Sequence, residues 1–350
     1  MIASVHHLEN KFFAVDIDSE GCLTRIYDKI NEREVLKPGE RGNVIQAYDD
    51  HPRVYDNWEI SNYYTEKMWE VNDVVSVEVE EVTSLLASLR ISKKFLNSTI
   101  VQKVIIYRDI PRIDFDTEIH WKEHHILLKA AFPVDILSDK ASYEIQYGSI
   151  ERPTHTNTSW DEAKFEVCAQ KWADLSEDGY GAAVLNDCKY GYDIHDGVMK
   201  ITLLKSGTYP NPEADTGKHV FRYSFMPHSG GWREGGVVRE GYAVNCPLKT
   251  FEAAGGGILP EKFSLVTSSA ENVIVSAVKY ACDSDDIILR VYEAYGRRTK
   301  VKLQMGIDIK EVYDSNFIET ENYDEMEKRE NSFEFIIKPY EIKTFRISKK

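Results

Sequence analysis

Alternating apolar residues in the first half of the chain constrain its fold more than any other feature. Between Trp69 and Trp121 the alternation has a period of two, and it runs through four segments: Val74–Val82, Leu85–Ser92, Thr99–Tyr107 and Arg112–Trp121. Turn-forming residues separate these segments at regular intervals. Such a pattern is typical of antiparallel sheets that bury one face. The sequence therefore predicts a mostly β protein.

Further strand segments extend this pattern toward both termini. An opening hairpin is predicted over Phe12–Tyr27, with its turn at Ser19-Glu20-Gly21. Strands are also predicted at Ile126–Val134, Tyr143–Tyr147, Phe165–Trp172, Gly181–Leu185, Met199–Leu204, Val220–Met226, Asn272–Tyr280, Ile287–Tyr295, Lys300–Met305, Ser332–Lys338 and Ile342–Ser348. The highly charged segment Glu319–Asn331 is predicted to be a solvated loop.

One interval departs from the alternation. The segment Trp232–Leu248 spaces Val238, Tyr242 and Asn245 as a helix would, and Pro247 ends it, so one short helix is predicted there. The three glycines at 255–257, followed by Pro260, indicate a joint between domains. We therefore expect a large sheet-on-sheet domain over residues 1–262 and a small β-sandwich over residues 263–350.

The stretch Gln146–Asn186 combines aromatic and polar side chains at unusual density. It holds Trp160 and Trp172, together with the polar residues Arg152, Thr154, His155, Thr156, Asn157, Thr158, Ser159, Asp161 and Glu166. This combination is what a sugar-binding cleft needs, because a pyranose has an apolar face and a rim of hydroxyl groups. A fully hydrogen-bonded polar corner between two sheets explains the same composition. The residues alone leave both interpretations open.

Two other segments are candidates for function. The aromatic-rich segment Asp49–Tyr64 contains Pro52, which excludes an interior strand position there. It is either a long functional loop or an aromatic plug that covers the core. Asp187 follows a predicted strand and precedes the segment Cys188–Asp193. A ligand contact and an Asx-type turn explain Asp187 equally well.

No motif in the sequence predicts catalysis or metal binding in this chain. It contains no G-x-S-x-G, P-loop, dinucleotide-binding or H-E-x-x-H motif. The densest histidine group is His120, His124 and His125 around Glu123. In a β context, solvated polar positions explain these residues more simply than a metal site. Carboxylates are plentiful, but their spacing does not reveal a glycosidase pair.

Composition limits the partners and the cellular compartment that we expect for this protein. The formal net charge is −15 and no basic patch is present, which argues against a nucleic-acid partner. The five cysteines are far apart, odd in number and without a C-x-x-C pair, which indicates a reducing compartment. No signal peptide and no apolar run of membrane-spanning length is found. We expect a cytoplasmic protein without a membrane partner.

The segment Arg152–Asp193, RPTHTNTSWDEAKFEVCAQKWADLSEDGYGAAVLNDCKYGYD, resembles the C-terminal β region of α-mannosidases of glycoside hydrolase family 38. The bacterial and cytosolic branch of that family is the most similar. The segments Leu8–Lys29, Ala214–Trp232 and Glu341–Ile347 resemble other parts of the same region, so the likeness spans essentially the whole chain. It implies a large antiparallel supersandwich of the galactose-mutarotase-like kind, followed by a small C-terminal β-sandwich.

The resemblance also implies which domain of the complete enzyme carries the catalytic residues. In this family the catalytic zinc, its ligands and the aspartate nucleophile belong to an N-terminal α/β domain. The resemblance therefore implies no catalytic residue, metal or cofactor in this chain, and an N-terminal catalytic domain as its partner. Asn43 and the turn at Asp187 match positions near the sugar in relatives. Some relatives have an arginine where this chain has Cys188, a departure that argues against a direct charged contact. The matching motif adds Arg152, His155, Asn157 and Trp160 to the predicted substrate-binding residues.

The leading hypothesis is a non-catalytic, carbohydrate-associated C-terminal portion of a zinc-dependent retaining α-mannosidase. It would serve as scaffold and cleft wall for an α-mannoside bound by the catalytic domain. One alternative is a free-standing carbohydrate-binding module that uses the surface around Trp160 and Trp172. Another is an aldose mutarotase-like enzyme that uses His155 and Glu166 as acid and base. Surface that the catalytic domain would cover is expected to be unusually apolar or aromatic, at the loops Asp49–Tyr64 and Arg152–Trp160, which also predicts self-association into a homo-oligomer.

Overall fold

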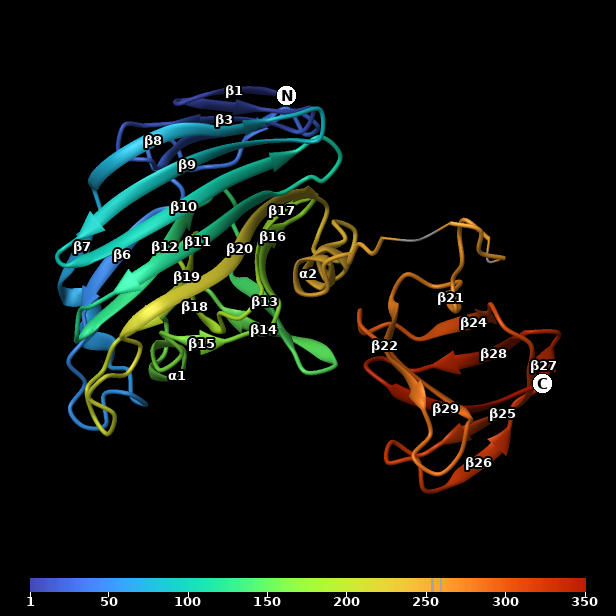
Figure 1. The fold of residues 1–350 in the computed structure, drawn as a ribbon. Coiled ribbons are helices and arrows are strands. Elements are labelled where there is room, and N and C mark those ends of the chain that lie inside the picture. The colour runs from blue at the N-terminus through green and yellow to red at the C-terminus, as the bar shows by residue number, and fades with distance from the viewer. Residues whose placement is uncertain (253–254, 259) are drawn as a thin grey trace. The chain divides into compact units, whose positions relative to one another are not determined.

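A computed structural model describes residues 1–252, 255–258 and 260–350 of the chain. These residues form two compact units, which are coloured by residue number in Figure 1. The first unit comprises residues 1–144 and 150–247, and the second comprises residues 145–149 and 248–350. The domain boundary expected at residue 262 stays a prediction.

A nine-stranded antiparallel sheet forms one layer of the first unit, counted over the described residues (Figure 1). The four strands at one edge, β8 to β11, pair in sequence order, as the alternation predicts. From one edge to the other the strands are β14 (Gly148–Pro153), β13 (Lys140–Ile145), β16 (Trp172–Glu177), β17 (Tyr180–Asn186), β20 (Gly217–Ser229), β11 (Ile113–Trp121), β10 (Ser98–Tyr107), β9 (Leu86–Phe95) and β8 (Asp73–Val82).

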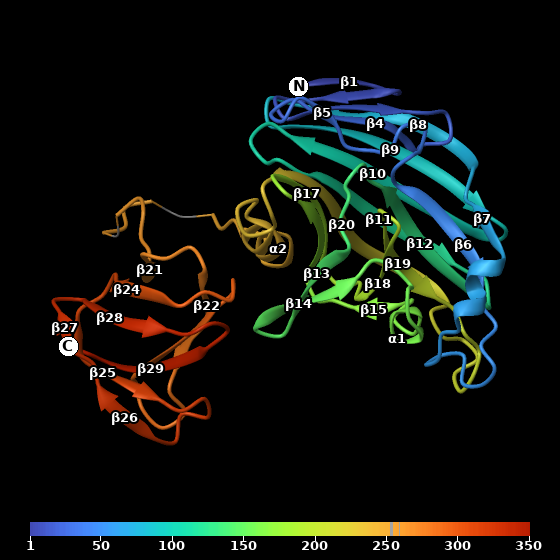
Figure 2. The ribbon, with the colours of Figure 1, turned by 180° about the vertical axis from the view of Figure 1, so that it is seen from behind.

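Two smaller antiparallel sheets lie against this layer, and Figure 2 shows them from behind. The six-stranded sheet has the order β15 (Val167–Cys168), β18 (Gly191–His195), β19 (Val198–Lys205), β12 (Ile126–Pro133), β6 (Val44–Asp49) and β7 (Met68–Glu70). The five-stranded sheet has the order β1 (Ile2–Ser4), β2 (His7–Glu9), β3 (Phe13–Ile17), β4 (Leu23–Asp28) and β5 (Arg33–Glu34). The pairing of β3 with β4 confirms the predicted opening hairpin.

The layers share one buried apolar core, which draws residues from all three sheets. Phe132 of β12 stacks on Phe225 of β20 with ring centroids 4.6 Å apart, and it also contacts Phe115 of β11 at 5.7 Å. Successive residues of a strand point to opposite faces of its sheet, so every second side chain of these strands points into the shared core. The other side chains lie on the outer faces of the sheets, and in β12 they are buried as well. This arrangement confirms the predicted mostly β supersandwich.

The predicted short helix is present as α2 (Val237–Asn245). It lies over β16 and β17, where Gly241 allows a close approach: a Cβ there would lie 3.1 Å from the Trp172 ring. The sequence did not predict α1 (Ser159–Glu162), which begins after Thr158, whose hydroxyl accepts a hydrogen bond from the Asp161 backbone N–H. A 3-10 helix, η1, covers Asn62–Glu66. Among the described residues, no helix has the length and apolar character that crossing a bilayer requires.

The second unit is a small sandwich of two antiparallel sheets in its described residues. One sheet has the order β21 (Val266–Ser268), β24 (Thr299–Met305), β28 (Ser332–Ile337) and β27 (Lys328–Arg329). The other has the order β22 (Val273–Tyr280), β23 (Ile287–Glu293), β29 (Ile342–Lys349), β25 (Ile309–Ser315) and β26 (Asn322–Glu325). Phe333 and Phe345 join the two sheets with ring centroids 4.9 Å apart. This confirms the expected small sandwich.

Two local predictions were wrong. The segment Glu319–Asn331 is not a continuous loop, because it contributes the edge strands β26 and β27. The predicted strand Phe165–Trp172 is reduced to the two residues of β15, and Trp172 begins β16 in a different sheet. A run of apolar residues spaced two apart does not show where a chain leaves one sheet for another.

Candidate functional site

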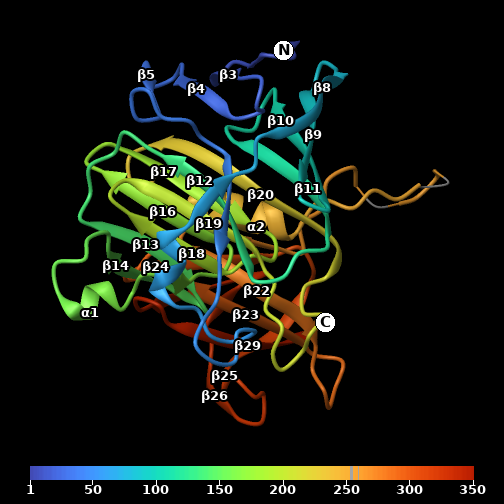
Figure 3. The same ribbon diagram turned by 90° about the vertical axis from the view of Figure 1, so that its left-hand side faces the viewer.

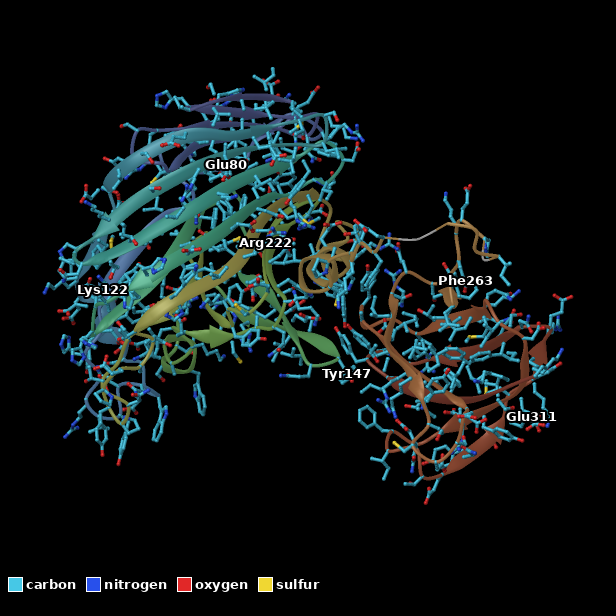
Figure 4. The ribbon with its side chains drawn as sticks, viewed as in Figure 1. Glu80, Lys122, Tyr147, Arg222, Phe263 and Glu311 are labelled. Carbon is cyan, nitrogen blue, oxygen red and sulfur yellow. The ribbon has the colours of Figure 1, made fainter. Side chains whose placement is uncertain are left out.

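A cavity of about 710 Å³ lies on the outer face of the nine-stranded sheet. Its floor includes Lys103 of β10, whose neighbours Gln102 and Val104 point into the core. Glu80 and Arg222, labelled in Figure 4, line it from β8 and β20. Asp187, one of the predicted substrate-binding residues, also lines this cavity. Its volume is within the range of about 300–1,000 Å³ usual for ligand sites.

Paired charges line much of this cavity. Lys103 Nζ lies 2.8 Å from Glu80, and Arg222 Nη2 donates to Asp116 at 2.7 Å. The hydrogen bond with Asp116 raises the pKa of Arg222, so its guanidinium stays charged. Because these charges are neutralised in pairs, the cavity suits a neutral polar ligand better than an ion.

Asp187 has one carboxylate oxygen without a hydrogen bond from the described residues. Its Oδ2 accepts the backbone N–H of Arg222 at 3.0 Å. Its Oδ1 is buried and has no hydrogen-bond partner among the described residues. A buried acceptor of this kind is normally satisfied by a protein group or by water. Because Asp187 Oδ1 has almost no exposed surface, the structure shows an unsatisfied buried acceptor there and not an open ligand contact.

The turn after Asp187 carries a thiol with a raised pKa. Partial desolvation of the sulfur, together with the neighbouring Asp187 carboxylate, raises the pKa of Cys188 to about 11, although the residue as a whole is exposed. Burial lowers the pKa of Lys189, whose Nζ lies 4.3 Å from the centroid of the Phe221 ring. A thiol with so high a pKa is almost entirely protonated at neutral pH, and it is a poor nucleophile.

Four predicted residues lie on the segment that leads from β14 through α1. The Arg152 guanidinium lies over the Tyr143 ring at 4.6 Å, and its Nη1 is buried without a hydrogen-bond partner among the described residues. His155 Nδ1 lies 3.7 Å from Asp161. Asn157 is exposed, and Trp160 is 82% exposed. None of these four lines the cavity around Asp187.

Asn43 lies in the core, where it is 1% exposed. Its Nδ2 donates to Gln102 at 2.6 Å, and its Oδ1 accepts the Tyr223 hydroxyl at 2.6 Å. This network joins β10 and β20 to the start of β6, and it leaves no Asn43 surface for a sugar. The six predicted residues are thus distributed over three places instead of one site.

The two alternative sites of the sequence analysis are also separated by the fold. Trp172 is 1% exposed and packs against Trp232 at 4.9 Å, whereas Trp160 is exposed, so the two form no common surface. Glu166 accepts the Thr202 hydroxyl at 2.6 Å and pairs with Lys129. The carboxylate that the mutarotase-like hypothesis pairs with His155 is therefore held by other groups.

The histidine group does not converge on a metal position. His120 pairs with Glu118 at 2.8 Å, His125 stacks on His51, and Glu123 accepts the Ser98 hydroxyl at 2.8 Å. Across residues 1–252, 255–258 and 260–350, no group of three or more His, Cys, Asp or Glu side chains is placed to hold a metal ion. The described residues do not fit a zinc site, and no reaction step through zinc is assigned to them.

The sequence analysis missed an exposed aromatic cluster. It singled out the loop at 49–64 but not its structural partner, the loop that carries Tyr209. Tyr55, Trp58 and Tyr209 are 48%, 75% and 58% exposed, and their rings are in contact. The sequence does contain an indication of this second loop. In the segment Tyr209-Pro210-Asn211-Pro212 an aromatic residue precedes a run of turn-forming residues, which is typical of an exposed loop.

Two family models match consecutive parts of the chain. Residues 8–213 match the glycosyl hydrolases family 38 C-terminal domain. Residues 272–345 match the glycosyl hydrolases family 38 C-terminal beta sandwich domain.

Individual relatives extend the match over nearly the whole chain. Alpha-mannosidase 2C1 from Homo sapiens is 34% identical over 344 residues, which cover 96% of this chain and 33% of that protein. Alpha-mannosidase G from Dictyostelium discoideum is 35% identical over 352 residues, which cover 97% of this chain and 32% of that protein. The chain therefore spans about a third of the length of the curated relatives it matches.

A solved structure shares the fold. An alpha-mannosidase from Enterococcus faecalis V583 superposes with a TM-score of 0.82 at 16% identity. The match covers 98% of this chain and 42% of that one. At this identity the likeness supports the fold alone.

Proposed function

Because the chain belongs to the C-terminal region of glycosyl hydrolases family 38, we propose that it is the non-catalytic β portion of a zinc-dependent, retaining α-mannosidase. The observation that carries this proposal is the succession of two C-terminal family matches in a chain about a third as long as its relatives. The proposed substrate is an α-mannoside, and the proposed partner is an N-terminal catalytic domain.

In this proposal the chain supplies a scaffold and part of the cleft wall. The catalytic domain would hold the carboxylate nucleophile and the acid–base carboxyl of a retaining glycosidase. Zinc bound there would orient the sugar and stabilise the transition state. Asp187 is the predicted substrate-binding residue that lines the cavity on the nine-stranded sheet, and in this proposal the sugar lies nearest to it. We also propose a reducing, cytoplasmic location, which agrees with five free cysteines among the described residues.

Hydrolysis of an aryl α-mannoside tests whether this chain is non-catalytic and depends on a catalytic domain for turnover. The purified chain is assayed with and without added zinc, and again with the N-terminal catalytic portion of an α-mannosidase relative. We expect no turnover by the chain alone at either zinc concentration. Full-length Alpha-mannosidase 2C1 is the positive control for the assay. Turnover by the chain alone that zinc supports and a chelator abolishes would refute the non-catalytic role.

A further inference from the structure

Strand β12 brings two loops distant in sequence to one end of the first unit. Strands β6 and β19 both pair with β12 in antiparallel fashion, so they run parallel to each other on either side of it. Their last residues, Asp49 and Lys205, lie opposite the start of β12 at Ile126 and Leu127. The loops that follow them therefore leave the sheet at the same ends of the strands. Figure 1 shows the blue and yellow loops projecting together there, and Figure 3 shows the first unit from that side.

The two loops present a stack of three aromatic rings. Tyr55 stacks on Trp58 with ring centroids 5.5 Å apart and an interplanar angle of 11°. Tyr55 also contacts Tyr209, with ring centroids 5.3 Å apart and an interplanar angle of 41°. Trp58 is 75% exposed and Tyr209 is 58% exposed, so the outer surface of the stack is open to solvent. Large aromatic rings left this open on a structured surface commonly mark a binding site.

A buried carboxylate holds the two loops together. Asp56 accepts the backbone N–H groups of Thr208 at 2.8 Å and of Tyr209 at 2.7 Å. The Asn57 N–H donates to the Tyr209 carbonyl at 3.1 Å. A Cβ on Gly207 would lie 2.5 Å from the Asp56 carbonyl oxygen, so glycine is required for this close approach. These bonds hold the loop backbones that carry the aromatic rings before any ligand binds, which lowers the entropy cost of binding.

A hollow of about 430 Å³ lies beside the stack. Tyr55 and Tyr209 form an aromatic part of its wall, and Arg53, Val54 and Thr208 also line it. The volume is within the range usual for small-ligand sites. An aromatic wall accepts the apolar C–H face of a sugar ring, and the Arg53 guanidinium donates hydrogen bonds to hydroxyl groups.

From this geometry we infer that the hollow binds a pyranoside, stacked on Tyr209 and Tyr55. A neutral ligand fits because aromatic rings supply most of the exposed contact surface. Trp58 stacks on Tyr55 beside the hollow and is largely exposed, so its ring can contact a second sugar unit of an oligosaccharide. The choice of a mannoside as the sugar rests on the proposed function, whereas the site itself rests on the loops described above.

Saturation-transfer NMR with the full chain tests this site. The probes are methyl α-mannopyranoside, the corresponding glucoside and galactoside, a linear α-mannotetraose, and mannitol. Mannitol has the hydroxyl groups of mannose without a pyranose ring, so it isolates the contribution of the ring face. We expect transfer to the mannosides and none to mannitol. Tyr209→Ala should weaken mannoside binding by about tenfold, the scale of one lost aromatic contact.

Matched variants separate the site from general effects on the fold. Tyr323→Ala removes a tyrosine of similar exposure, 59%, from β26 in the second unit, and it should bind as the wild type does. Trp58→Ala should weaken α-mannotetraose more than methyl α-mannopyranoside. Thermal unfolding confirms that each variant is folded.

Three results would overturn the inference. They are no transfer to any pyranoside, equal affinity of Tyr209→Ala and the wild type, and loss of binding in Tyr323→Ala. Transfer to the glucoside or galactoside but not to the mannosides would overturn the assignment of mannose. None of these results depends on hydrolysis, so they are distinguishable from a failure of the proposed function.

Discussion

Removal of the Glu166 carboxylate should destabilise the first unit strongly. Lys129 is fully buried, and its Nζ contacts Glu166, the Thr202 hydroxyl at 3.0 Å and the face of the Tyr64 ring at 5.3 Å. In Glu166→Ala the ammonium group stays buried without a countercharge at hydrogen-bond distance. Loss of one member of a buried ion pair costs about 3–5 kcal/mol. We expect the lower value, about 3 kcal/mol, because Thr202 remains as an acceptor.

Urea unfolding followed by tryptophan fluorescence measures this cost selectively. All six tryptophans, from Trp58 to Trp232, belong to the first unit, so the signal does not report on the second unit. With a denaturant dependence of about 3 kcal/mol per molar urea, the midpoint should fall by about 1 M. The double variant Lys129→Met/Glu166→Ala should recover much of this loss, because the unpaired charge is gone.

An exposed ion pair of the same unit provides the control. Lys11 and Asp109 are 2.6 Å apart, and their side chains are 56% and 55% exposed. Exposed pairs contribute little to stability, so Asp109→Ala should leave the midpoint unchanged within error. If Glu166→Ala shifted the midpoint no more than Asp109→Ala does, or if the double variant were less stable than Glu166→Ala, the reasoning from the buried charge would be wrong.

Two further predictions concern titratable groups of the first unit. Burial opposes ionisation of Asp193, but the hydrogen bond from His195 and the charges of Lys129 and Lys200 lower its pKa overall. A lowered pKa stabilises the fold above the unfolded value of about 3.9 and ceases to do so as the pH falls through the folded value. Asp193→Asn should therefore be less stable than the wild type at pH 7, with a difference that shrinks in urea titrations below about pH 4; a difference independent of pH would contradict this. Cys188, whose pKa is raised to about 11 by partial desolvation and by Asp187, should react with iodoacetamide at pH 8 more slowly than a free thiol of pKa about 8.5. Asp187→Asn should speed this reaction, as followed by mass spectrometry of the Cys188 peptide, and an unchanged rate would count against the role of the carboxylate.

Features that depend on local pattern were predictable from the sequence. The hairpin of β3 and β4 and the succession β8 to β11 follow from alternation and turn residues, and both are present. Helix α2 follows from the spacing of Val238, Tyr242 and Asn245. Very short elements were missed: β1, β2 and α1 have three or four residues each, too few for a period to show. Their formation depends on pairing partners and caps that distant residues or single side chains supply.

The candidate sites were harder to predict, because strand pairing and not sequence distance decides which side chains meet. Trp160 and Trp172 are neighbours in the sequence, yet one is exposed on α1 and the other is buried in β16 beneath α2. Tyr55 and Tyr209 are far apart in the sequence, yet they touch because β6 and β19 flank the same strand, β12. Alternation identifies β12 and β19 as strands, but it did not predict β6 and contains nothing about the order of strands across the sheet. A search of the sequence for local clusters therefore finds the Arg152–Trp160 segment, whereas the aromatic stack requires the sheet topology.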